Sequence, residues 1–136
     1  MAGLVLDASV AVAAVLEEAH AEGARAILQH VANVGAVVPN LWHLEVGQTL
    51  LVAERQGRLT AAERETAQGL LLELPVAVDA DTWARAMRDT IDLALQQHLS
   101  LYDAAYLELS RRSNMPLATF DANLRRAAAA IGVVLL

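Results

Sequence analysis

The sequence predicts an α/β fold, with a mostly parallel sheet of about five strands flanked by helices. Two observations predict it. Short apolar segments alternate with longer helical ones along the chain, as in sheets whose parallel strands are joined by helices. Several apolar segments also stop directly at an acidic residue, which marks the carboxyl end of a strand. The chain has 136 residues, the usual size of one domain, and we expect residues 1–136 to form one.

The first part of the chain predicts strand, helix, helix and strand. Residues 3–6 are apolar without alternation, as in a central parallel strand, and they stop at an acid. Helices are expected over residues 9–16 and 20–31, because a serine begins the first and apolar residues recur on one face of the second. Residues 36–38 form a short strand, ended by a proline.

The middle of the chain predicts a helical hairpin beside the sheet. A long helix is expected over residues 39–58. Thr60 followed by Glu63 is a capping box, which begins a second helix that runs to residue 73. The stripe of the first helix that is expected to face inward consists of Leu41, Leu44, Glu45, Gln48, Leu51 and Val52.

The last part returns to alternating elements. An acid at position 81 and a serine at position 100 are expected to begin helices, and Gly132 to end one. The expected elements are a strand over 75–78, helices over 81–95 and 100–112, a strand over 117–120, a helix over 123–130 and a strand over 133–136.

The composition excludes several kinds of chemistry. There is no cysteine, which excludes disulfides, thiolate metal sites and thiol catalysis. All 10 basic residues are arginine, so Schiff-base chemistry and Walker-type phosphate loops are excluded as well. The net charge of −6 disfavours duplex DNA as a partner. No apolar run approaches the roughly 20 residues of a membrane span, and the N-terminus does not look like a secretion signal, so we expect a cytoplasmic protein.

Four acids lie where packing alone would favour apolar residues. Asp7 and Asp121 directly follow predicted strands, and the carboxyl ends of parallel strands share one edge of a sheet. Glu45 lies on an apolar helix stripe, where an unpaired carboxylate is costly. Asp103 lies in the first turn of its helix, whose dipole stabilises an anion. Asp7, Asp103 and Asp121 also have a purely structural explanation, as residues that stabilise helix N-termini.

Together these acids predict a cation site. Carboxylates crowded at one edge cannot all ionise unless a cation neutralises them. Oxygen ligands without histidine or cysteine suit Mg²⁺ or Mn²⁺, and such sites suit phosphoryl chemistry. Asp79 and Asp81 also follow a strand, but we interpret them as a surface acid and a helix cap.

Short motifs along the whole chain point to a family. They are Leu6-Asp7-Ala8-Ser9-Val10, Pro39 through Glu45-Val46, Gly57-Arg58-Leu59-Thr60, Leu101-Tyr102-Asp103-Ala104-Ala105-Tyr106, Leu117-Ala118-Thr119-Phe120-Asp121 and Ala128-Ala129-Ala130-Ile131-Gly132-Val133. In order and spacing they resemble the PIN-domain family, and most closely the VapC-type toxins of bacterial toxin–antitoxin pairs. The resemblance implies a single PIN-like domain.

The resemblance also implies an activity and its residues. It implies an endoribonuclease that depends on Mg²⁺ or Mn²⁺, hydrolyses RNA phosphodiester bonds and is neutralised by a cognate VapB-like antitoxin. It further implies a homodimer. The metal-binding and catalytic acids would be Asp7, Glu45, Asp103 and Asp121, with Ser9 and Thr119 as supporting hydroxyls. Two positions depart from the family pattern: Gln48, where asparagine is common, and Asn123, where some members carry a further acid.

Other residues and other classes stay open at this stage. Arg111, Arg112, Arg125 and Arg126 are candidates for an RNA groove, although paired arginines near helix ends are more often solvated or ion-paired. Tyr102 and Tyr106 are interpreted as core or interface residues. A receiver domain or a haloacid-dehalogenase phosphatase would need a lysine that the chain lacks. A PIN-fold nuclease of RNA processing or DNA repair, or a PIN-fold binding module without catalysis, remains an alternative.

Overall fold

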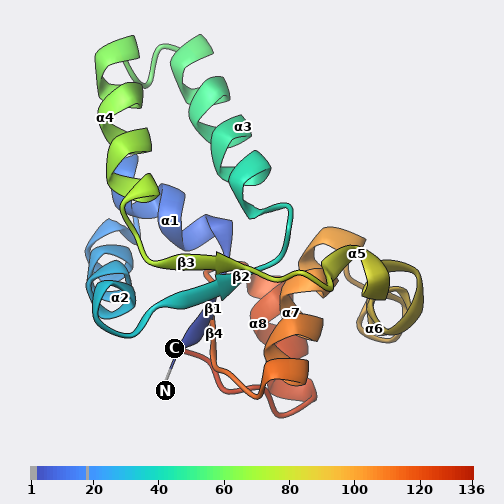
Figure 1. Cartoon of the computed structure of the whole chain (residues 1–136). Coiled ribbons are helices and arrows are strands. Elements are labelled where there is room, and N and C mark those ends of the chain that lie inside the picture. The colour runs from blue at the N-terminus through green and yellow to red at the C-terminus, as the bar shows by residue number, and fades with distance from the viewer. Residues whose placement is uncertain (1–2, 18) are drawn as a thin grey trace.

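The chain forms a four-stranded, wholly parallel sheet with the strand order β3-β2-β1-β4. The computed structural model describes residues 3–17 and 19–136 (Figure 1). The strands are β1 (Leu4–Leu6), β2 (Ala36–Val38), β3 (Val76–Val78) and β4 (Leu117–Ala118). The helices are α1 (Ala8–Val15), α2 (Ala21–Val34), α3 (Trp42–Arg55), α4 (Ala61–Leu72), α5 (Thr82–Arg85), η1 (Ala86–Thr90), α6 (Ile91–Gln97), α7 (Leu101–Ser113) and α8 (Ala122–Ala130). The predicted α/β class is therefore confirmed.

The number of strands is one fewer than predicted. The C-terminal residues 133–136 meet β4 only through an isolated parallel bridge between Leu117 and Leu135. The Leu117 N–H donates to the carbonyl of Val134 at 2.8 Å, and the Leu136 N–H donates to the carbonyl of Leu117 at 3.0 Å. Because β4 itself is only two residues long, it offers too little edge for a full fifth strand.

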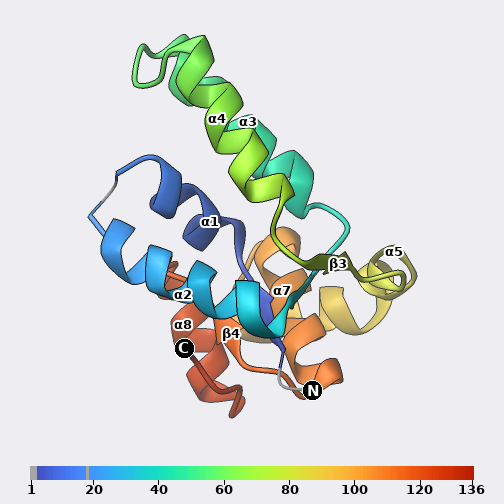
Figure 2. The same cartoon turned by 60° about the vertical axis from the view of Figure 1, so that its left-hand side comes forward.

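Strands β1, β2 and β4 are mostly buried, whereas the edge strand β3 is largely exposed. Helices lie on both sides of the sheet, as Figures 1 and 2 show. The strand β1 is fully buried, in agreement with its unbroken apolar sequence. The helix α7 packs against β1 and β4, and α6 covers α7 from outside. The hairpin formed by α3 and α4 extends away from the sheet (Figure 2). Among the described residues, no helix has both the length and the apolar character to span a membrane.

The helix α3 turns a different face inward from the predicted stripe. Leu44 is 79% exposed and Leu51 is 38% exposed, and Gln48 is exposed as well. The buried residues of this helix are Trp42, Val46, Leu50 and Ala53. The sequence offers apolar residues on more than one side of this helix, and packing against α1 and α4 selects the side that carries Trp42.

The helix predicted over residues 81–95 is interrupted. It is divided into α5, the π-helical turn η1 and α6, and the backbone of Met87 and Arg88 is not helical. By contrast, the predicted capping box of α4 is present, with both hydrogen bonds between Thr60 and Glu63. Local hydrogen bonds are readable from sequence spacing, whereas a helix kink depends on what the helix must pack around.

Candidate metal centre

Asp7 is the most deeply buried of the four predicted acids. It follows β1 directly, is 5% exposed, and its backbone N–H donates to the carbonyl of Ala118 at the end of β4. Its Oδ2 accepts hydrogen bonds from Ser9 Oγ at 2.6 Å and from Thr119 Oγ1 at 2.7 Å. It makes no side-chain cap to α1, so the helix-capping explanation does not hold for Asp7.

The two hydroxyls beside Asp7 are themselves oriented by the backbone of the opposite strand end. Ser9 Oγ accepts from the N–H of Phe120 at 3.2 Å, and Thr119 Oγ1 accepts from the N–H of Asp121 at 3.1 Å. Because each hydroxyl oxygen accepts from an N–H, its own proton is available to donate to the carboxylate. Ser9 and Thr119 therefore connect Asp7 to the turn that carries Asp121.

Glu45 reaches the same region from the base of the hairpin. It lies in the first turn of α3 and is half-buried. Its Oε1 accepts a hydrogen bond of 2.5 Å from the hydroxyl of Tyr106, a fully buried residue of α7. Tyr106 was interpreted from sequence as a core or interface residue, and its link to Glu45 was missed. The available signal is its spacing, since Tyr106 follows Asp103 by one helical turn.

Asp103 and Asp121 lie at the N-termini of α7 and α8. For α7 the cap is Ser100, whose Oγ accepts from the backbone N–H of Asp103 at 3.1 Å. Asp103 is thus not needed as the cap. Asp121 does cap α8, because its Oδ1 accepts from the N–H of Leu124 at 2.8 Å. The helix-capping explanation is therefore correct for Asp121, and it involves one of the two carboxylate oxygens.

These acids lie near enough to one another for their charges to act on one another's pKa. Burial, together with the charge of Asp121, raises the pKa of Asp7 above its usual value, against hydrogen bonds from Ser9 and Thr119 that lower it. Burial and the charges of Asp7 and Asp103 likewise raise the pKa of Glu45. Burial, followed by the charges of Asp121 and Asp7, raises the pKa of Asp103 to about 6. Mutual repulsion of this kind is relieved when a cation enters.

The donor set fits a hard divalent cation. All four side chains offer carboxylate oxygens, the ligand type that Mg²⁺ and Mn²⁺ prefer. Among the described residues, however, no three acidic or histidine side chains already converge closely enough to hold a metal ion. Because like charges repel, we expect these side chains to stay apart without a cation and to move together when a cation binds.

The predicted arginines lie in different surroundings from one another. Arg125 contacts the segment that carries Asp121, because its Nη1 donates to the carbonyl of Thr119 at 2.9 Å. Arg126 donates to the carbonyl of Gln97 at 3.2 Å. Arg111 and Arg112 lie at the opposite end of α7 from Asp103, about 12 to 14 Å away along the helix axis. The structure therefore does not bring these four arginines together.

Arg112 is held within the protein. It pairs with Asp79 at 2.7 Å and with Glu108 at 2.8 Å. The side chain of Asp79 is only 9% exposed, so its interpretation as a surface acid was wrong. Although burial alone would raise it, hydrogen bonds from Arg112 and Thr82 lower the pKa of Asp79. Asp81 makes no side-chain cap to α5, contrary to expectation.

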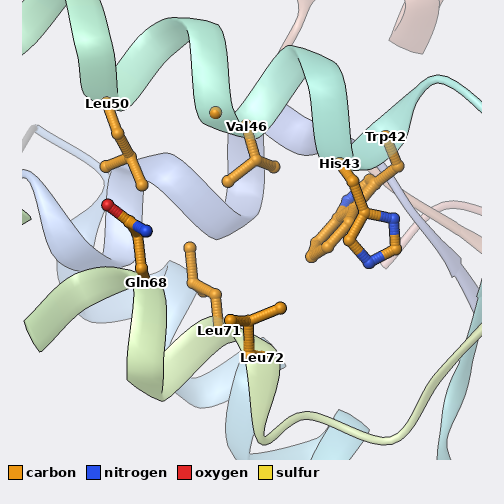
Figure 3. Close-up of a pocket in the computed structure, with 8 residues that line it drawn as sticks. Trp42, His43, Val46, Leu50, Gln68, Leu71 and Leu72 are labelled. Carbon is orange, nitrogen blue, oxygen red and sulfur yellow. The ribbon is translucent and has the colours of Figure 1, made fainter. Parts of the chain in front are cut away.

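A separate pocket lies between α3 and α4 (Figure 3). Its walls are mostly apolar, and none of its lining residues is acidic. The lining residues are Trp42, His43, Val46, Gly47, Leu50, Gln68, Leu71 and Leu72. It therefore offers no carboxylate to a hard cation, and the four predicted acids stay the candidate metal centre.

Comparison with known proteins agrees with this fold. Residues 4–130 match the PIN domain, and the chain belongs to that family. It is 29% identical over 121 residues to Ribonuclease VapC3 of Pyrobaculum aerophilum, covering 89% of this chain and 91% of that protein. The fold matches the crystal structure of PAE2754 from Pyrobaculum aerophilum with a TM-score of 0.72 and 21% identity, covering 98% of this chain and 90% of that one. The predicted resemblance to VapC-type PIN proteins is thereby confirmed.

Proposed function

We propose that this protein is a VapC-type endoribonuclease that hydrolyses RNA phosphodiester bonds with Mg²⁺ or Mn²⁺. One observation carries the proposal. Asp7, Glu45 and Asp103 come from three separate elements, yet burial and the charge of at least one other acid among Asp7, Asp103 and Asp121 raise the pKa of each. A stable fold gains nothing from such repulsion, and perturbed acids gathered in one place are typical of a working site. The ribonuclease relative supports RNA as the substrate.

Each acid has a separate part in holding the ion. A bound Mg²⁺ or Mn²⁺ would activate water and offset the charge that develops on the phosphate. Asp7 is kept in place by Ser9 and Thr119, and Glu45 by Tyr106. Asp103 and Asp121 complete the set from the ends of two helices. Because the carboxyl of Asp103 has a pKa of about 6, metal uptake below that pH releases protons.

The test is cleavage of a cellular RNA pool by purified protein that is free of any antitoxin. The reactions contain Mg²⁺, Mn²⁺ or a chelator, and are repeated with Asp103→Asn and with the exposed-acid control Asp92→Asn. We expect discrete metal-dependent cuts from the unsubstituted protein and from Asp92→Asn, and none from Asp103→Asn. Equal cleavage by Asp103→Asn would remove Asp103 from the site. A protein that binds the cation but cuts no RNA would favour a PIN-fold binding module or a nuclease with another substrate.

The partners belong to the same proposal. We infer that a VapB-like antitoxin neutralises the protein, that it acts in the cytoplasm, and that it forms a homodimer. Large apolar side chains on α5, η1 and α6 support a second copy as a partner, since Trp83, Met87 and Leu95 are all strongly exposed. Exposed apolar surface of this kind is usual where proteins associate.

A further inference from the structure

The hydrogen bond between Tyr106 and Glu45 joins the site to a residue with no assigned role. Tyr106 is 0% exposed, and its hydroxyl donates to Glu45 Oε1 at 2.5 Å. These residues are 61 positions apart in the sequence and lie on different helices. A buried tyrosine hydroxyl needs a hydrogen-bond partner, and here that partner is one of the four acids.

Glu45 needs such a restraint more than the other acids do. It is carried by α3, in the hairpin that extends away from the sheet (Figures 1 and 2), while Asp7 and Asp121 follow strands β1 and β4. Asp103 lies in the first turn of α7. A glutamate side chain also has more rotatable bonds than an aspartate, so holding it in one place costs more conformational entropy. A donor fixed in the core removes much of that freedom before any cation binds.

The geometry leaves the rest of the carboxylate available. Tyr106 occupies Oε1, and among the described residues no hydrogen-bond donor is assigned to Oε2. Asp7 shows a related arrangement, since its Oδ2 accepts from Ser9 and Thr119. In both cases a neutral hydroxyl orients the acid without cancelling its charge, which is how groups around a metal ligand prepare it.

We propose that Tyr106 is a positioning residue that holds Glu45 ready for the divalent cation. The proposal rests on the proposed function, because it assumes that Glu45 is a ligand. Tyr106 follows Asp103 by one turn of α7, so a single rigid helix carries one acid of the site and the donor that orients another. Helix α7 thereby fixes Asp103 and Glu45 relative to each other, although α3 carries Glu45.

The same helix provides a matched control. Tyr102 is 65% exposed, and no hydrogen bond of its hydroxyl is found among the described residues. Tyr106→Phe and Tyr102→Phe each remove one hydroxyl from α7 and leave the ring. Only Tyr106→Phe removes a donor to Glu45. Circular dichroism and thermal unfolding of both variants serve to check that they keep the fold.

The experiment measures Mn²⁺ binding to the full chain by calorimetry, without RNA. We expect Tyr106→Phe to weaken the Kd for Mn²⁺ by about 10-fold or more, the usual cost of losing a group that orients a ligand. Tyr102→Phe should leave the Kd unchanged. In a Glu45→Ala background, Tyr106→Phe should have no further effect, because the carboxylate that it orients is gone.

The outcomes separate the two proposals. If the unsubstituted protein binds Mn²⁺ and Tyr106→Phe binds it equally well, Tyr106 serves only the core and the positioning role is overturned. The positioning role would also be overturned if Tyr106→Phe weakened Mn²⁺ binding equally in the Glu45→Ala background, since the effect would then not depend on Glu45. Absence of both Mn²⁺ and Mg²⁺ binding by the unsubstituted protein would overturn the proposed function, and this inference with it.

Discussion

At the scale of single residues, the acids of the site oppose the stability of the fold. Asp7, Glu45 and Asp103 all have pKa values raised by burial and by neighbouring acids. A raised carboxyl pKa means that the folded protein binds protons more tightly than the unfolded chain does. The metal-free fold is therefore strained electrostatically at neutral pH, and the strain is concentrated where the cation is proposed to bind.

Asp103→Asn tests this strain directly. The pKa of Asp103 is about 6 in the folded protein, against 3.8 in a model compound. Protonation of Asp103 therefore stabilises the folded protein fully below pH 4, and this stabilisation is lost as the pH rises through 6. In chelator at pH 7.5 we expect Asp103→Asn to be more stable than the unsubstituted protein by about 1 kcal/mol, a value reduced for solvent screening of this half-buried group. The difference should shrink toward pH 4.

The measurement is urea unfolding at pH 4, 6 and 7.5, with chelator present throughout. The control is Asp92→Asn, an exposed acid on α6, which should leave the free energy of unfolding nearly unchanged. Destabilisation by Asp103→Asn at pH 7.5 would contradict a repulsive pocket. It would show that Asp103 instead serves the fold as a favourable charge at the start of α7.

At the scale of elements, Arg112 connects α7 to the segment that follows β3. Its guanidinium pairs with Glu108 on the same helix and with Asp79 just after β3. The side chains of these two acids are 5% and 9% exposed, so Arg112 neutralises charge that water barely reaches. This explains why an arginine near a helix end, a candidate for RNA contact by sequence, instead has a role in the fold.

Neighbouring arginines make this role testable. Arg112→Gln leaves Asp79 and Glu108 without their cation, and we expect a loss of roughly 3 kcal/mol in the free energy of unfolding. Arg111→Gln, the exposed neighbour, should change it by no more than about 0.5 kcal/mol. Urea unfolding of both variants gives the comparison. Equal stability of the two variants would mean that the ion pairs of Arg112 make no net contribution to the free energy of unfolding.

At the scale of the whole molecule, apolar residues remain outside the core. The segment from α5 to α6 exposes Trp83, Met87 and Leu95, and its backbone departs from helical geometry at Met87 and Arg88. Such a surface is costly in water and is stabilised when a second copy covers it. The homodimer proposed above would use this side of the molecule.

Two leucines allow the surface to be tested. Leu95 on α6 and Leu72 on α4 are each 72% exposed. Leu95→Ser is expected to weaken association by about 10-fold or more, since it removes apolar area that a dimer would bury. Leu72→Ser, with the same change at the same exposure, should leave association unchanged. Sedimentation equilibrium over a range of concentrations measures both. A monomeric unsubstituted protein, or equal association of the two variants, would remove this surface from any dimer.

The sequence was most informative where structure depends on near neighbours. The capping box of Thr60 and Glu63 follows from spacing alone, and so does the cap of α7 by Ser100. Asp7 and Asp121 were predicted to share one edge because parallel strands end together, and the charge of Asp121 indeed acts on Asp7. Their placement needed no knowledge of side-chain packing.

The remaining features depend on contacts between distant segments. The inward face of α3, the partner of Tyr106 and the pairing of Arg112 with Asp79 each join residues that sequence spacing cannot relate. The kink at Met87 and Arg88 and the reduction of the predicted fifth strand to a single bridge depend in the same way on neighbouring segments of the fold.

Thus the sequence by itself determined the fold class and the family, and it predicted a site of four acids, because periodicity, capping and strand ends are local properties. Tertiary structure alone decided how those acids are held and which arginines are engaged. The physical reason is that burial and distance decide which group a hydroxyl or guanidinium binds. Burial and distance are set only when the chain has packed.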